Sequence, residues 1–77
     1  MKAIVTTEKN GTRFFLTASG MATDKPEQAY GCIYSCDAQR IADNANSEPQ
    51  WQRWGFRWEV AYMLHNGEIT LGDSVTA

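Results

Sequence analysis

The stretch Trp51-Gln-Arg-Trp-Gly-Phe-Arg-Trp-Glu-Val-Ala-Tyr-Met-Leu-His-Asn-Gly67 decides the fold of this chain. Every second residue from Trp54 to Leu64 is apolar, and most of these residues are aromatic or β-branched. This period of two predicts a strand whose buried face carries Trp54, Phe56, Trp58, Val60, Tyr62 and Leu64. Trp51, Trp54 and Trp58 also have helical spacing, but Gly55 and the β-favouring composition count against a helix.

Asn66-Gly67 directly follows this strand and predicts a hairpin with a two-residue loop, because a type I′ turn needs positive φ at both central residues. Such a loop pairs Leu64 with Ile69 and Tyr62 with Leu71. All four residues then lie on the face that the alternation predicts to be buried, so the turn and the pattern indicate the same register.

The beginning of the chain predicts a similar hairpin around Asn10-Gly11, with Glu8 opposite Arg13. One face of this hairpin is apolar and is the better candidate for the core; it carries Ala3, Val5, Phe14 and Leu16. Phe15 lies on the opposite face, where we expect its ring to be only partly covered.

A narrow apolar stripe predicts one helix from about Cys36 to Asn46, with Ser35 as its N-cap. The stripe is Ala38, Ile41, Ala42 and Ala45. Such small side chains let a helix lie close to a sheet that carries large ones.

The segments around this helix give weaker signals. Residues 18–28 read as a loop, and residues 30–34 are a short β-prone run that would add a strand. Residues 48–53 predict a helical turn or loop, introduced by a capping box of Ser47 and Gln50.

Together these signals predict one α+β domain over residues 1–77: an antiparallel sheet of four to five strands (ββ(β)αββ) with one helix packed on one face. The hairpins are expected at residues 2–17 and about 55–72. The chain shows neither a charged N-terminal segment followed by an apolar run nor an apolar run of membrane-spanning length. We therefore expect a soluble, cytoplasmic protein that does not enter a membrane.

Cys32, Cys36 and His65 are the candidate metal ligands. Structural zinc sites usually present a Cys-x2-Cys pair and four ligands in all, so a Cys-x3-Cys pair with one distant histidine is a poor match. Nucleophilic catalysis needs a base held by a third group, and no such partner can be identified for Cys36. We therefore expect no metal, no cofactor and no enzymatic activity.

The sheet face opposite the helix presents residue types that are enriched in protein interfaces, with Trp51 at its edge. This suggests a partner-binding surface made of Phe15, Trp51, Arg53, Arg57, Glu59, Met63 and His65. We expect a non-catalytic module that binds another protein or a second copy of itself.

A second hypothesis is single-stranded nucleic-acid binding by Trp51, Arg53 and Arg57, because aromatic rings interleaved with cations are typical of such surfaces. The net charge of −2 counts against it, since nucleic-acid binders usually carry a basic surplus. In length, mild acidity and ββαββ plan, the chain resembles the small α+β proteins that phages encode to engage host enzymes or defence complexes. This resemblance implies a viral inhibitor or adaptor that acts on a host protein complex.

Overall fold

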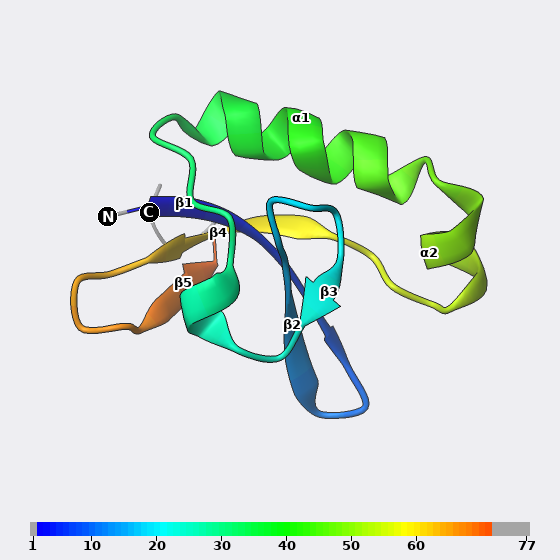
Figure 1. Ribbon diagram of the computed structural model, residues 1–77, viewed down its shortest axis with the longest axis horizontal. Helices are drawn as coiled ribbons and strands as arrows, with labels where there is room; N and C mark the ends of the chain where they lie inside the picture. The colour runs from blue at the N-terminus through cyan, green and yellow to red at the C-terminus, as the bar shows by residue number, and fades with distance from the viewer. Residues whose placement is uncertain (1, 72–77) are drawn as a thin grey trace.

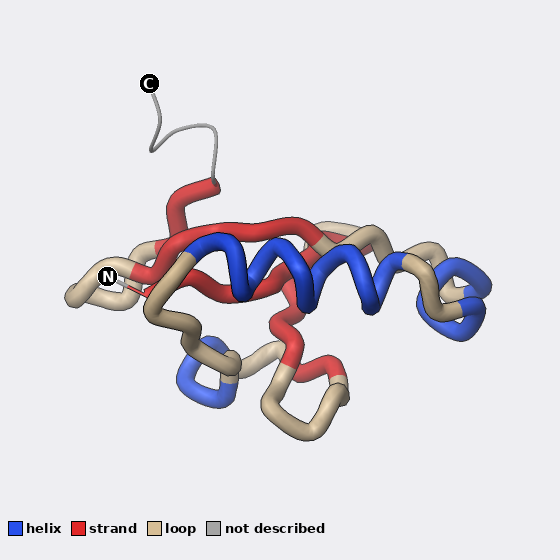
Figure 2. The backbone as a smooth tube through the Cα atoms, turned by 90° about the horizontal axis from the view of Figure 1, so that it is seen from above, coloured by secondary structure: helices blue, strands red, loops and turns tan. Residues whose placement is uncertain are grey.

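Five antiparallel strands form one sheet in the order β3-β2-β1-β4-β5, and the helix α1 packs on β1 and β4 (Figure 1). Figure 2 shows α1 running lengthwise beside the central strands. The computed structural model describes residues 2–71, and the predicted α+β class is confirmed. The elements are β1 (Lys2–Lys9), β2 (Thr12–Leu16), β3 (Ala22–Thr23), the 3-10 helix η1 (Pro26–Gln28), α1 (Ser35–Asn46), α2 (Pro49–Arg53), β4 (Glu59–Met63) and β5 (Ile69–Leu71).

The N-terminal hairpin has the predicted turn and register. Its paired residues run from Lys9–Thr12 to Thr6–Phe15. Asn10 and Gly11 have φ of 55° and 82°, as a type I′ turn requires. β1 pairs with β2 along its second half and with β4 along its first half, which makes it the central strand.

The predicted alanine stripe of α1 lies against the sheet. Ala38, Ala42 and Ala45 are buried together with Trp51 and Trp58 in the main core. This core also takes Ala3, Val5 and Leu16 from the face of the first hairpin that we predicted to be buried. Alanine therefore allows close approach of the helix to a sheet that carries large rings.

The second hairpin differs from its prediction by one residue in register. Met63 pairs with Ile69, where Leu64 was expected. The Gly67 N–H donates to the Leu64 carbonyl (3.0 Å), and Gly67 itself has φ of 89°. The loop is thus His65–Gly67, in which a turn is followed by a glycine with positive φ, and such a three-residue loop adds one residue to the connection.

This shift moves Ile69 to the sheet face opposite α1, where it packs with Met63. The placement of Ile69 in the main core was therefore wrong. The backbone of Leu71 pairs with Ala61 in place of Tyr62. The predicted burial of the Leu71 side chain and the predicted end of the hairpin at residue 72 lie outside the part that the structure describes.

The predicted strand start at about residues 54–55 is wrong, because β4 begins only at Glu59. Trp54 is instead the C-cap of α2, and residues 54–58 form a loop. The helical turn expected over residues 48–53 is present as α2.

α2 ends in a Schellman motif, which explains the late start of β4. The Gly55 N–H donates to the Gln52 carbonyl (3.1 Å), and the Phe56 N–H donates to the Trp51 carbonyl (2.9 Å). Gly55 has φ of 80°, which glycine adopts easily. The rings of Trp51 and Phe56 stack with centroids 5.4 Å apart, the apolar contact that commonly accompanies this motif.

The side-chain amide of Asn46, at the end of α1, makes the two hydrogen bonds to the Trp58 backbone that a neighbouring strand would otherwise make. Its Nδ2 donates to the Trp58 carbonyl (2.8 Å), and its Oδ1 accepts the Trp58 N–H (2.7 Å). The preceding N–H, that of Arg57, donates to Thr7 Oγ1 (3.3 Å). Side chains of α1 and β1 therefore hydrogen bond the loop that leads into β4.

The two predicted helix caps are not formed. Ser35 is the first residue of α1, and its N-cap is Tyr34, without a side-chain hydrogen bond. Ser47 Oγ donates to the Asn44 carbonyl, and the N-cap of α2 is Glu48.

The connection from β2 to α1 contains more regular structure than predicted in one part and less in another. β3 and η1 lie within the expected loop of residues 18–28. Residues 30–34 do not form a strand, and only Cys32 makes a bridge, to Ala3 of β1. This bridge lies beyond the part of β1 that pairs with β2.

Asn46→Ala should lower the free energy of unfolding by about 1–3 kcal/mol, because the buried backbone of Trp58 loses both hydrogen-bond partners. Asn44→Ala is the matched control, since Asn44 is exposed on the same helix. This control should unfold at the same or a slightly higher urea concentration, because alanine is the better helix former. Equal urea midpoints for the two variants would show that the Asn46 amide does not hold Trp58.

Candidate functional site

The seven residues predicted to bind a partner do not form one surface. Arg53, Arg57, Glu59 and His65 are exposed, Met63 is half-buried, and Phe15 and Trp51 are buried. They come from α2, the loop after it, β2, β4 and the β4–β5 loop.

Phe15 is only 3% exposed, so the expectation that its ring is partly uncovered is wrong. It belongs to a second apolar cluster on the sheet face opposite α1, with Ile4 and Ala61. Ala29, which follows η1, packs against this cluster, as do Met63 and Ile69. Side chains of β4, β5 and the segment after η1 thus pack over the part of this face that we had expected to be open.

Trp51 and Trp54 have exchanged the positions predicted for them. Trp51 is 5% exposed and belongs to the main core, whereas Trp54 is 57% exposed. Trp51 is the third residue of α2, and Trp54 is the C-cap of that helix. The sequence signal for this arrangement was Gly55 followed by Phe56, because a glycine and then an apolar residue are typical of a Schellman helix end.

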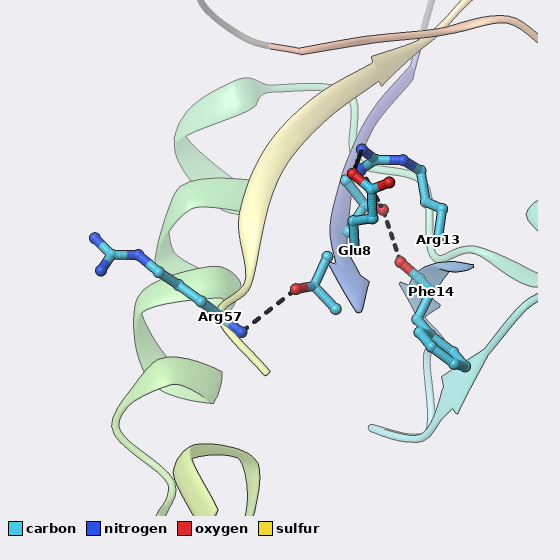
Figure 3. A network of polar contacts seen from close by, with 6 residues as sticks. Glu8, Arg13, Phe14 and Arg57 are labelled. Carbon is cyan, nitrogen blue, oxygen red and sulfur yellow. Dashed lines mark hydrogen bonds and ion pairs between the residues drawn. The ribbon is translucent and has the colours of Figure 1, made fainter. Parts of the chain in front are cut away.

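A polar network lies where β1 and β2 approach their turn (Figure 3). The buried Thr6 hydroxyl donates to the Phe14 carbonyl (2.7 Å) and accepts from the Arg13 guanidinium (3.2 Å). Arg13 also pairs with Glu8 at 3.6 Å, a partly exposed contact that stabilises the fold little. Figure 3 shows the Arg57 side chain extending away from this network, with only its backbone N–H bound.

Three large apolar side chains lie exposed in the connection between η1 and α1. They are Tyr30, Ile33 and Tyr34, which we call the 30–34 surface, and Ile33 is the most exposed of them at 89%. The sequence showed these residues as a β-prone run, but only Cys32 within it is buried and bridged to the sheet. The unpaired run therefore presents its apolar side chains outward.

Two hollows border the 30–34 surface, and both are lined by Tyr30 and Ile41. The first has a volume of about 330 Å³ and lies between α1 and the β2–β3 turn, with Leu16, Ala45 and Trp51 among its lining residues. The second, also about 330 Å³, is lined by the 30–34 segment and the start of α1. The exposed apolar side chains are therefore combined with concave surface.

The two cysteines have different environments and both are free thiols. Burial, and then the negative charge of Asp37, raise the pKa of the Cys32 thiol, while Arg40 acts in the opposite direction. Cys36 lies exposed in the first turn of α1. Within residues 2–71, no group of three or more His, Cys, Asp or Glu side chains is placed to hold a metal ion.

None of the helices described is long and apolar enough to cross a membrane. Comparison of the chain with protein-family models, with curated proteins and with solved structures finds no match.

Phe15→Ala should lower the free energy of unfolding by about 3–5 kcal/mol, because it removes a ring from the second apolar cluster. His65→Ala is the control, because His65 was also predicted to bind a partner but is exposed in the structure. This substitution should change the free energy of unfolding by no more than about 0.5 kcal/mol. Thermal unfolding followed by circular dichroism measures both. A Phe15→Ala variant as stable as the control would mean that this ring is not enclosed.

Iodoacetamide should modify Cys36 well before Cys32. The raised pKa leaves Cys32 with a smaller thiolate fraction than a cysteine of ordinary pKa has at the same pH, and the thiolate is the reacting form. Cys36 is in addition exposed to the reagent, whereas Cys32 is buried. Mass spectrometry of the protein at about pH 8 measures the order of labelling. The Cys36→Ser variant should then be labelled slowly in the folded state and rapidly in denaturant, and fast labelling of this variant when folded would contradict the burial of Cys32.

Proposed function

We propose that this chain is a small protein-binding module without catalytic activity, and that the 30–34 surface is its contact face. The observation that carries the proposal is the exposure of Tyr30, Ile33 and Tyr34 within five consecutive residues. The same chain buries the rings of Phe15, Trp51 and Trp58 almost completely.

Clustered exposed apolar side chains are typical of sites that a partner covers. Full burial of a side chain such as Ile33 contributes about 1.5–3 kcal/mol, and tyrosines are frequent anchors in interfaces. The two hollows beside Tyr30 can receive apolar side chains of the partner. At the rim of the second hollow, Asp37 and Arg40 form an exposed ion pair, consistent with the polar rim of an interface.

In this proposal the module acts as a cytoplasmic inhibitor or adaptor, in the manner of the phage-encoded proteins that it resembles in plan. Such proteins act by occupying a surface of a host complex. This role requires a stable fold and an exposed apolar surface, and the 30–34 surface supplies the second requirement.

Ile33→Asp should weaken capture of a protein partner while leaving the fold intact, because Ile33 is exposed. The immobilised wild type and variant are compared in a nuclease-treated bacterial lysate, and the expected loss is about tenfold or more. Trp54→Asp is the matched control, since it places the same charge on an exposed aromatic residue outside the 30–34 surface.

Capture by the wild type and by Trp54→Asp, with loss only in Ile33→Asp, supports the proposal. Equal capture by all three proteins would place the interface elsewhere. Sedimentation of the purified chain shows whether the partner is a second copy: a dimer that Ile33→Asp converts to a monomer assigns the 30–34 surface to self-association.

A further inference from the structure

The positive charges of this acidic chain are concentrated in two short segments. Residues 9–13 and 51–58 contain four of the seven Lys and Arg residues and no Asp or Glu. The remaining residues carry all nine acidic side chains. The net charge of −2 therefore conceals a basic region, and local fields of this kind attract anionic ligands.

The fold brings these two segments together. Lys9 Nζ lies 5.2 Å from the centroid of the Phe56 ring, a cation–π contact. The Arg57 N–H is bound to Thr7, two residues before Lys9. Arg53 is the last residue of α2 and directly precedes the exposed Trp54.

The backbone of Trp54 is fixed by hydrogen bonds, while its side chain is exposed to solvent. Its ring meets those of Trp51 and Phe56 at 85° and 90°, so neither neighbour is stacked in parallel on it. The Schellman motif fixes the backbone on both sides of Gly55. The indole of Trp54, a residue that is 57% exposed, is therefore suited to stacking against a flat aromatic ligand.

Three cations of these two segments take no part in the ion pairs of the described residues. Within residues 2–71, the ion pairs join Arg13 to Glu8 and Arg40 to Asp37, and none involves Lys9, Arg53 or Arg57. Together with Trp54 these three residues form what we call the Trp54 patch: Lys9, Arg53, Trp54 and Arg57.

We propose that the Trp54 patch binds single-stranded nucleic acid, with a base stacked on Trp54 and the adjacent phosphates beside the three cations. Sites that bind single strands combine a stacking ring with a positively charged surface, and both parts are present here. An acidic peptide would use the cations but not the exposed indole, and a duplex would keep its bases stacked on each other. This site lies outside the 30–34 surface and is independent of the function proposed above. It replaces Trp51, the ring suggested by the sequence, with Trp54.

The probe is a fluorescein-labelled oligothymidine of about twelve nucleotides, and binding is measured by fluorescence anisotropy over a range of KCl concentrations. Three phosphate contacts predict that the logarithm of the affinity falls with the logarithm of the salt concentration with a slope of about −2. Arg53→Gln and Arg57→Gln should each reduce this slope by about 0.7. Lys25→Gln, which removes an exposed cation at η1, should leave it unchanged.

Trp54→Ala should weaken binding by about tenfold without changing the salt slope, because it removes stacking and no charge. Trp54→Phe should retain most of the affinity, which separates stacking from any effect of the substitution on the fold. Ile33→Asp should bind the oligonucleotide like the wild type, because Ile33 lies outside the Trp54 patch. Loss of protein capture and loss of oligonucleotide binding can therefore be measured separately.

Three results would overturn the proposal. The wild type could fail to bind the oligonucleotide at low salt, or Trp54→Ala could bind as tightly as the wild type. An oligoglutamate peptide could also displace the oligonucleotide at an equal concentration and bind Trp54→Ala unchanged, which would make this an acidic-peptide site.

Discussion

The two hydrogen bonds between the Asn46 side chain and the backbone of Trp58 are the constraint on which the rest of the structure depends. They join the end of α1 to the start of β4, and they place the Trp58 ring between the helix and the sheet. The chain between these points must then turn back within about ten residues, which α2 and the Gly55 helix end accomplish. The burial of Trp51 and the exposure of Trp54 follow from this path.

The sequence was sufficient where one signal had one structural meaning, and insufficient where two structures share a signal. The alanine stripe and the turn at Asn10-Gly11 were predicted correctly because period and turn chemistry agree there. Asn66-Gly67 fits both a two-residue and a three-residue loop, and the structure adopts the longer one, in which only Gly67 among the loop residues has positive φ. The alternation predicted the core-facing side correctly for Phe56, Trp58, Val60 and Tyr62. It was misleading about where the strand begins, because side chains of Asn46 and Thr7, distant in sequence, hydrogen bond the backbone that a neighbouring strand would otherwise pair.

The two surfaces proposed as binding sites lie where the chain leaves regular structure. The 30–34 surface follows η1 and is connected to the sheet through Cys32 alone, whereas the Trp54 patch lies at the end of α2. Neither could be identified from residue type alone. Trp54 is exposed because Trp51 entered the core in its place, and Tyr30, Ile33 and Tyr34 are exposed because their run does not pair as a strand. Five of the predicted contact residues remain at least partly exposed, but Phe15 and Trp51 serve the fold.

Iodide quenching of tryptophan fluorescence tests most directly whether residues 51–58 follow this path. Each of the three tryptophans is replaced by phenylalanine in turn, and the quenching that remains is compared with that of the wild type. Trp54→Phe is expected to remove most of the quenching, because Trp51 and Trp58 are shielded from solvent. If the quenching is lost in Trp51→Phe and retained in Trp54→Phe, then Trp54 is in the core, the strand begins before Glu59, and the account of this structure is wrong.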